Sequence, residues 1–137
     1  MGSQIFESFM KEVDADIYLY AHATAPYIKI ETINECINAV KSGQYDSAFC
    51  AEKIQDYLWE NGKPLNFDAS NLPRSQDINP IYRETSGVYA FAKEVFLKMH
   101  RRIGITPFIK EVTLREAVDI NNPEDFILAE KMLDVNI

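Results

Sequence analysis

The segment from Glu111 to Leu133 carries the residues whose spacing best suits chemistry. The pattern predicts a strand end, a tight acidic turn and a capped helix. Asp119 falls on the short link, and Asn122 followed by Pro123 has the order of a helix cap and a first helical position. A carboxylate held between a strand end and a helix start is well placed to hold a divalent cation against phosphates. The alternative is that Asp119 merely caps the second helix, and the spacing alone favours that alternative.

Helices and strands alternate around this segment. Apolar periodicity predicts helices over about 5–13, 32–42, 93–102 and 123–133, and strands over 17–23, 47–51, 87–91 and 107–112. Thr32 with Glu35, and Thr113 with Glu116, have the spacing of capping boxes. A strand, a helix and a strand in succession form a right-handed crossover, which predicts a parallel sheet. The expected fold class is α/β, with a partial doubly wound and mainly parallel sheet.

The middle of the chain predicts a hairpin. Asn61-Gly62 is the strongest short hairpin signal. Trp59 and Leu65 are large apolar residues for a hairpin that projects from a sheet, and exposed apolar surface usually marks a partner surface. We therefore expect a dimerisation arm over about residues 54–68, and a homodimer or higher oligomer. The alternative is a hairpin folded onto its own domain.

Composition and charge restrict the partners. The 137 residues suit a single domain. The net charge of −7 argues against a nucleic acid or an anionic membrane surface as the main partner. No apolar run approaches the roughly 20 residues of a membrane span. Cys36 and Cys50 fall at positions expected to be buried, as small hydrophobes in a reduced cytosol, so a cytoplasmic location is expected.

Several segments in a fixed order are familiar: YLYAHATAPYI (18–28), the Asn-Gly hairpin, LPRSQDINPIYRETSGVYAF (72–91) and EAVDINNPEDFILAE (116–130). From about Phe6 to Leu133 the chain resembles the acylneuraminate cytidylyltransferases, which make CMP-activated nonulosonic acids such as CMP-sialic acid. The resemblance implies a Rossmann-like nucleotidyltransferase sheet. It also implies a reaction in which the anomeric hydroxyl of a 2-keto sugar acid attacks the α-phosphate of CTP and pyrophosphate leaves. CTP and a sugar acid are then the expected partners.

The resemblance also implies a magnesium ion. The family's metal-binding motif is Asp-x-Asp, and here it is Asp119-Ile120-Asn121. Asp119 matches the first ligand and is the expected catalytic residue. Asn121 replaces the second ligand, so it offers a neutral carbonyl oxygen in place of a charge. A Mg²⁺ ion that keeps one carboxylate, several waters and substrate phosphates fits this motif, with weaker binding than a two-carboxylate site.

The sugar-acid contacts carry over by position. His22 stands where the family has a glutamine, and Thr24 follows the pattern; His22 is equally well explained as a strand-end histidine. Arg74 matches the arginine that binds the sugar carboxylate with two parallel hydrogen bonds, although a lone loop arginine is usually solvated. Further matching positions are Lys53 (within one position of register), Gln76, Arg83 and Tyr89. Arg83 could equally be structural, and a tyrosine in that strand is more often part of a core.

Two departures limit the resemblance. Ile103-Gly104 stand where a sialic acid synthetase can have paired aromatics, which leaves other nonulosonic or 2-keto sugar acids open. The family's N-terminal strand and its glycine-rich CTP loop are not found. We therefore expect residues 1–137 to form the C-terminal part of a cytidylyltransferase domain, inactive as an isolated chain. The alternative is a non-catalytic dimeric binding or assembly module that retains this part of the fold.

Overall fold

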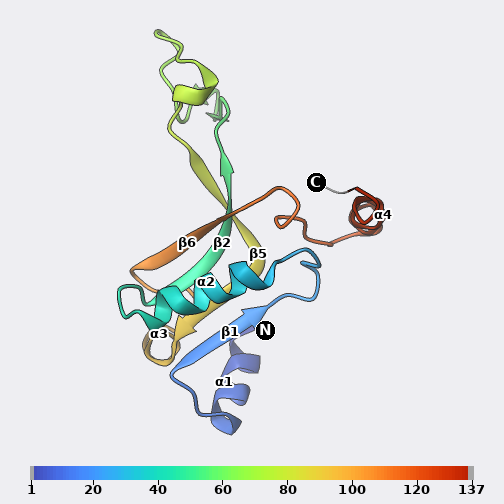
Figure 1. The fold of residues 1–137 in the computed structure, drawn as a ribbon. Coiled ribbons are helices and arrows are strands. Elements are labelled where there is room, and N and C mark those ends of the chain that lie inside the picture. The colour runs from blue at the N-terminus through green and yellow to red at the C-terminus, as the bar shows by residue number, and fades with distance from the viewer. Residues whose placement is uncertain (1, 136–137) are drawn as a thin grey trace.

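A computed structural model describes residues 2–135, with side chains from Gln4 onward. Helices and strands alternate along the chain (Figure 1). The elements are α1 (Gly2–Glu12), β1 (Ile17–Ala21), α2 (Ile30–Lys41), β2 (Ser47–Ile54), β3 (Trp59–Glu60), β4 (Lys63–Pro64), the 3₁₀ turn η1 (Ser75–Asp77), β5 (Ile81–Ala92), α3 (Lys93–Met99), β6 (Pro107–Val112) and α4 (Pro123–Met132).

The central sheet has four strands in the order β1-β5-β2-β6. β2 and β6 pair in parallel, while β5 is antiparallel to both β1 and β2. Since β1, β2 and β6 point the same way, the sheet is mainly parallel and the fold is a Rossmann-like α/β fold, as predicted. The two strands of the predicted crossover, β1 and β2, are parallel but not neighbours, because β5 lies between them. β5 returns from a hairpin connection to β2, and such a connection requires antiparallel pairing.

The sheet separates two hydrophobic cores. On one side α2 packs Cys36 and Val40 against residues of β2 and β5, among them Cys50. On the other side Phe96 of α3 packs against Phe91 of β5. Phe6 of α1 is also part of this second core. Both cysteines are buried and free, as expected.

Two helix boundaries differ from the prediction. α2 begins at Ile30, so Thr32 lies inside the helix and does not cap it. The Thr32 hydroxyl instead donates to Glu116 Oε1 at 2.6 Å. α3 ends at Met99 because His100 takes a left-handed conformation with φ of 52°, before the glycine that was expected to stop the helix.

The predicted hairpin forms at the end of a long excursion, residues 55–80, which we call the arm. β2 and β5 leave the sheet as a two-stranded ribbon, and the arm stands away from the sheet at the end of this ribbon (Figure 1). Asn61 and Gly62 both have positive φ, 50° and 77°, as a tight hairpin turn requires. Phe67 packs edge-on against Tyr57 and Trp59 within the arm. A role of the arm in dimerisation stays a prediction.

Within residues 2–135, no helix combines the length and the apolar character needed to cross a membrane.

Candidate functional site

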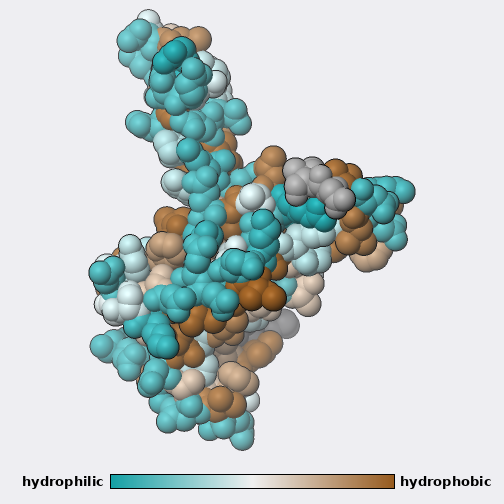
Figure 2. Space-filling view, in the orientation of Figure 1, coloured by the Kyte–Doolittle hydropathy of each residue, from teal (hydrophilic) through white to brown (hydrophobic). Residues whose placement is uncertain are grey.

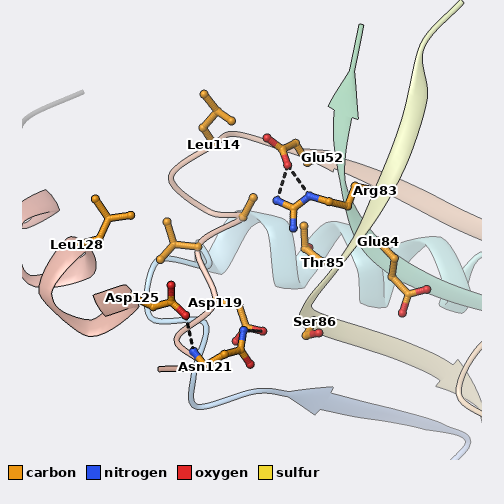
Figure 3. A pocket seen from close by; sticks show the side chains of 12 residues that line it. Glu52, Arg83, Glu84, Thr85, Ser86, Leu114, Asp119, Asn121, Asp125 and Leu128 are labelled. Carbon is orange, nitrogen blue, oxygen red and sulfur yellow. Dashed lines mark hydrogen bonds and ion pairs between the residues drawn. The ribbon is translucent and has the colours of Figure 1, made fainter. Parts of the chain in front are cut away.

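A pocket of about 340 Å³ lies at the edge of the sheet where β2 and β6 end (Figure 3). Ligands of open α/β sheets bind outside the carboxyl ends of the strands, so the position is the one that the fold predicts. The chain segments that meet here are the ribbon, the link after β6 and the start of α4. The lining residues are Glu52, Arg83, Glu84, Thr85, Ser86, Leu114, Ala117, Val118, Asp119, Asn121, Asp125 and Leu128.

Asp119 lies on the link between a helical turn and α4. Its Oδ2 accepts a hydrogen bond from Asn121 Nδ2 at 3.1 Å. Its Oδ1 is buried and has no hydrogen-bond partner among the described residues. Asn122, not Asp119, caps α4, because Asn122 Oδ1 accepts from the Asp125 amide at 2.9 Å. The capping alternative for Asp119 therefore fails, and a carboxylate oxygen is left for another partner.

The donor set near Asp119 consists of oxygen atoms. Asp125 lines the same pocket, and its Oδ2 accepts from the Asn121 amide at 2.9 Å. Within residues 2–135, no three His, Cys, Asp or Glu side chains converge as a metal cluster. A cation here would thus take few protein ligands and keep waters or phosphate oxygens, which is the habit of Mg²⁺. Asp119, with an unpartnered oxygen, and Asn121 fit that ion.

The pocket carries more negative than positive charge. Arg83 Nε donates to Glu52 Oε2 at 2.8 Å, so this arginine is already paired. Glu84, Asp119 and Asp125 line the pocket beside this pair. A phosphate or carboxylate ligand would meet net repulsion, and a bound cation would remove it. This charge balance is a second reason for a cation at Asp119.

A second cluster lies beside the pocket, on the face of the sheet covered by α3. The rings of His22 and Tyr20 are 4.4 Å apart, and those of His22 and Tyr89 are 6.1 Å apart. Tyr89 is only 1% exposed, and its hydroxyl donates to Glu84 Oε1 at 2.5 Å. Burial, followed by the hydrogen bond to Glu84, raises the pKa of Tyr89 to about 12. His22 Nε2 is buried without a partner among the described residues.

The remaining predicted site residues lie elsewhere. Thr24 is exposed, but its carbonyl accepts from the Ile120 amide at 2.9 Å and so ties the loop after β1 to the Asp119 link. Lys53 lies exposed on the ribbon. Arg74 lies on the arm, where its side chain is 74% exposed and Nε donates to Asp77 at 2.7 Å. Gln76, also on the arm, contributes its carbonyl to Gln55. The structure thus brings Arg83, Asp119 and Asn121 together, and His22 with Tyr89, but leaves Lys53, Arg74 and Gln76 outside the pocket.

Glu116 holds the turn that precedes the Asp119 link. It is 4% exposed, and Oε1 accepts from the Thr32 hydroxyl at 2.6 Å and from the Lys29 amide at 3.3 Å. The Thr113 hydroxyl also lies 3.3 Å from Oε2, so the predicted single turn with capping-box spacing is present. The carboxylate joins the start of α2 to the turn three residues before Asp119.

Sequence reasoning missed several residues of the site. Glu52, Glu84, Asp125 and Arg102 were not expected there. Asp125 had a visible signal, since it is an acid in the first turn of a capped helix. Arg102 had none, because its contact with Tyr89 depends on how the chain turns back after α3.

The fold is that of nucleotidyltransferases with known structures. The chain matches 4-diphosphocytidyl-2C-methyl-D-erythritol synthase from Anaerococcus prevotii DSM 20548 with a TM-score of 0.64 at 16% identity, over 98% of this chain and 67% of that one. It matches CMP:2-keto-3-deoxy-manno-octonic acid synthetase, solved with CTP, with a TM-score of 0.66 at 16% identity, over 97% and 68%. It matches 2-C-methyl-D-erythritol 4-phosphate cytidylyltransferase from Thermus thermophilus with a TM-score of 0.57 at 11% identity, over 97% and 69%.

These likenesses define the fold: the chain has a cytidylyltransferase-like fold and spans about two thirds of the length of each structure. No protein-family model and no curated protein matches the sequence. The neighbours include enzymes named for a sugar acid and enzymes named for a sugar phosphate.

Proposed function

We propose that the chain is the acceptor-binding part of a cytidylyltransferase that transfers CMP from CTP to a nonulosonic or other 2-keto sugar acid. The observation that carries the proposal is Asp119, whose unpartnered oxygen lies at the strand-end pocket of a cytidylyltransferase-like fold. In this reaction the anomeric oxygen of the acceptor forms a bond to the α-phosphorus of CTP. The bond between that phosphorus and the bridging oxygen breaks, pyrophosphate leaves, and the hydroxyl proton passes to solvent.

Asp119 and Asn121 would hold a magnesium ion, which supplies positive charge to the phosphate oxygens when bound. The other residues bind and orient. Arg83 with Glu52 forms one wall of the pocket, and Glu116 holds the turn before Asp119 against the start of α2. His22 and Tyr89 lie beside the pocket and would orient its wall, since Tyr89 holds Glu84 through a hydrogen bond.

The residues of this pocket are poorly suited to binding the triphosphate of CTP. The chain's five glycines form no glycine-rich phosphate loop, and the pocket is acidic. We therefore assign the binding of CTP phosphates to a separate nucleotide-binding segment, and we expect this chain to be inactive when isolated.

The test is pyrophosphate release from CTP, with Mg²⁺ and a panel of 2-keto sugar acids. The assay is run on this chain alone and on this chain mixed with the N-terminal part of a solved relative, such as the 2-keto-3-deoxy-manno-octonic acid synthetase. We expect release only in the mixture, and none when Asp119→Asn replaces the wild type. Release by the chain alone would show that the separate segment is unnecessary. Absence of release in both cases would favour the non-catalytic binding module.

A further inference from the structure

Arg102 is a half-buried cation that has no acidic partner among the described residues. Arg74 and Arg83 pair with carboxylates, and so do two of the lysines, Lys93 and Lys110. The chain has 21 acidic and only 14 basic residues, so acidic partners are in excess. Arg115 is also half-buried without an acid, but it donates to the carbonyl of Val135 and stacks on Tyr27. Among the described residues, the side chain of Arg102 donates only to the Tyr89 hydroxyl, so most of its five donors remain for an anionic ligand.

The guanidinium of Arg102 is held in place. Its Cζ lies 3.9 Å from the centre of the Tyr89 ring and 5.9 Å from that of Tyr20. Nη2 donates to the Tyr89 hydroxyl at 3.1 Å. Tyr89 itself is fully buried and bonded to Glu84, so the platform under the guanidinium is rigid. Stacking uses the face of the guanidinium, so the edge donors other than the one bonded to Tyr89 remain available. A fixed fork of donors suits a carboxylate or a phosphate.

The position of Arg102 links it to the proposed site. It shares Tyr20 and Tyr89 with His22, whose buried Nε2 lacks a partner among the described residues. Through Tyr89 and Glu84 it is connected to the pocket that contains Asp119. One residue, Tyr89, thus separates the guanidinium of Arg102 from Glu84 in the pocket wall.

We propose that Arg102 binds the oxyanion of the acceptor, and that this oxyanion is the carboxylate of the sugar acid. The inference rests on the proposed function, and it identifies a carboxylate-binding residue different from Arg74. The shared chemistry is that of a planar fork with an oxyanion, which a sugar phosphate also presents. The competing explanation is that Arg102 only fastens the end of α3 to the sheet.

The experiment measures dissociation constants by calorimetry for 2-keto-3-deoxy-manno-octonic acid, its methyl ester and 2-C-methyl-D-erythritol 4-phosphate. The proteins are the wild type, Arg102→Gln, Arg102→Lys and Arg101→Gln. Arg101 is the matched control, since it is the adjacent arginine and is exposed. Thermal unfolding shows whether each variant is folded, and Arg102→Lys keeps the charge if Arg102→Gln does not fold.

We expect Arg102→Gln to weaken binding of the acid at least ~10-fold, because one charge-assisted hydrogen-bond pair is lost. The dissociation constant of the ester should change less than ~2-fold. Arg102→Lys should lose part of this affinity, and Arg101→Gln none. If the phosphate and not the acid loses affinity, the oxyanion role holds but the carboxylate assignment is overturned.

Equal losses of affinity for the acid and the ester would show that Arg102 has only a structural role and would overturn the inference. If the ratio of the dissociation constants for acid and ester is the same in Arg102→Gln as in the wild type, the inference is overturned. If pyrophosphate release is also intact, the proposed function still stands. A wild type that binds neither the acid nor the phosphate would overturn both.

Discussion

Asn121 is the residue at which this site departs from a two-carboxylate pattern. Its side-chain amide donates to Asp119 while its backbone amide donates to Asp125, so it lies between two acids. We expect Asn121→Asp to tighten Mg²⁺ binding by ~10-fold, because a second carboxylate is added at the same pocket. Titration calorimetry with Mg²⁺ measures the change.

Two further variants serve as a loss-of-binding test and a control for the Mg²⁺ titration. Asp119→Asn should remove measurable Mg²⁺ binding, since it neutralises the carboxylate that has an unpartnered oxygen. Asp134→Asn is the matched control, because it removes one acid from an exposed position outside the pocket. An affinity for Mg²⁺ that is the same in Asn121→Asp and the wild type would count against a cation at this link.

The buried, hydrogen-bonded position of Glu116 makes the free energy of unfolding depend on pH in the acid range. Burial acts to raise the pKa of Glu116, but hydrogen bonds from the Thr32 hydroxyl and the Lys29 amide outweigh it and leave the pKa below its usual 4.5. A lowered folded-state pKa stabilises the fold above the unfolded value, and this contribution is lost as the pH falls through the folded value. We expect Glu116→Gln to cost about 1–3 kcal/mol at pH 7, and the cost to shrink below about pH 4. Urea unfolding at both pH values measures it.

Glu111→Gln is the control for that prediction, because Glu111 is an exposed acid near the end of β6. Its free energy of unfolding should follow the wild type at both pH values. A cost for Glu116→Gln that stays constant from about pH 7 to about pH 3.5 would show that shape, not charge, accounts for its role.

Of the predicted residues in the pocket, Asp119 came from the strand-turn-helix pattern and Arg83 from the family resemblance alone. Asp119 and Arg83 come to one pocket because both lie near the same edge of the sheet, and that edge follows from the order of elements. Arg102 was not predictable, since its place over Tyr89 depends on a left-handed residue, His100, that ends α3 early. Helical periodicity carries no information on such a turn.

The loop between α3 and β6 depends on a close contact with Asp46. The Asp46 carboxylate accepts from the amides of Ile105 at 2.7 Å and Thr106 at 3.2 Å. A Cβ on Gly104 would lie 2.2 Å from Asp46 Oδ2. Since that carboxylate is held by several donors, Gly104→Ala should cost about 1–3 kcal/mol of unfolding free energy. The measurement is a double-mutant cycle with Asp46→Ala by urea unfolding.

In the Asp46→Ala background the cost of Gly104→Ala should largely disappear, because the colliding atoms are gone. Gly43→Ala is the control. Its Cβ would meet nothing within 4 Å, but its φ of 77° makes any side chain strained. Its cost, about 1 kcal/mol, should be the same in both backgrounds. Additive effects of Gly104→Ala and Asp46→Ala would contradict the contact.

Most elements were predictable because apolar periodicity determines which face each one buries. The helices α1, α2, α3 and α4 lie where that spacing put them, within a few residues. The insertion of β5 between β1 and β2 was not predictable, because an apolar strand carries no mark of its neighbours or of its direction. Likewise Thr32 has the local pattern of a cap, yet a distant carboxylate, Glu116, engages its hydroxyl inside the helix.

At the scale of the whole molecule, the arm and α4 are two of the described regions that expose large apolar side chains. Trp59 and Leu72 of the arm are 60% and 64% exposed. At α4, Phe126 and Leu128 are 58% and 57% exposed, and Figure 2 shows apolar side chains at that end of the molecule. Exposed apolar surface of this kind marks interfaces.

We expect the chain to be a dimer or larger oligomer at micromolar concentration, as measured by light scattering. Replacing Trp59 and Leu72 with serine should shift it toward the monomer, since both are arm residues. Ile105→Ser is the control, because Ile105 is 72% exposed but lies outside the arm. A monodisperse wild-type monomer would contradict the role of the arm.

β5 is a single twelve-residue strand that contributes to the arm's ribbon and to the pocket wall. At about 3.3 Å per residue it is a continuous rod of roughly 40 Å. Its pairing with β2 is irregular between Phe49 and Ala51, and there the Thr85 hydroxyl donates to the Cys50 carbonyl. Such a bulge bends and twists the strand locally. A partner that binds the arm therefore contacts the ribbon formed by the same strand that supplies Arg83, Glu84 and Thr85 to the pocket.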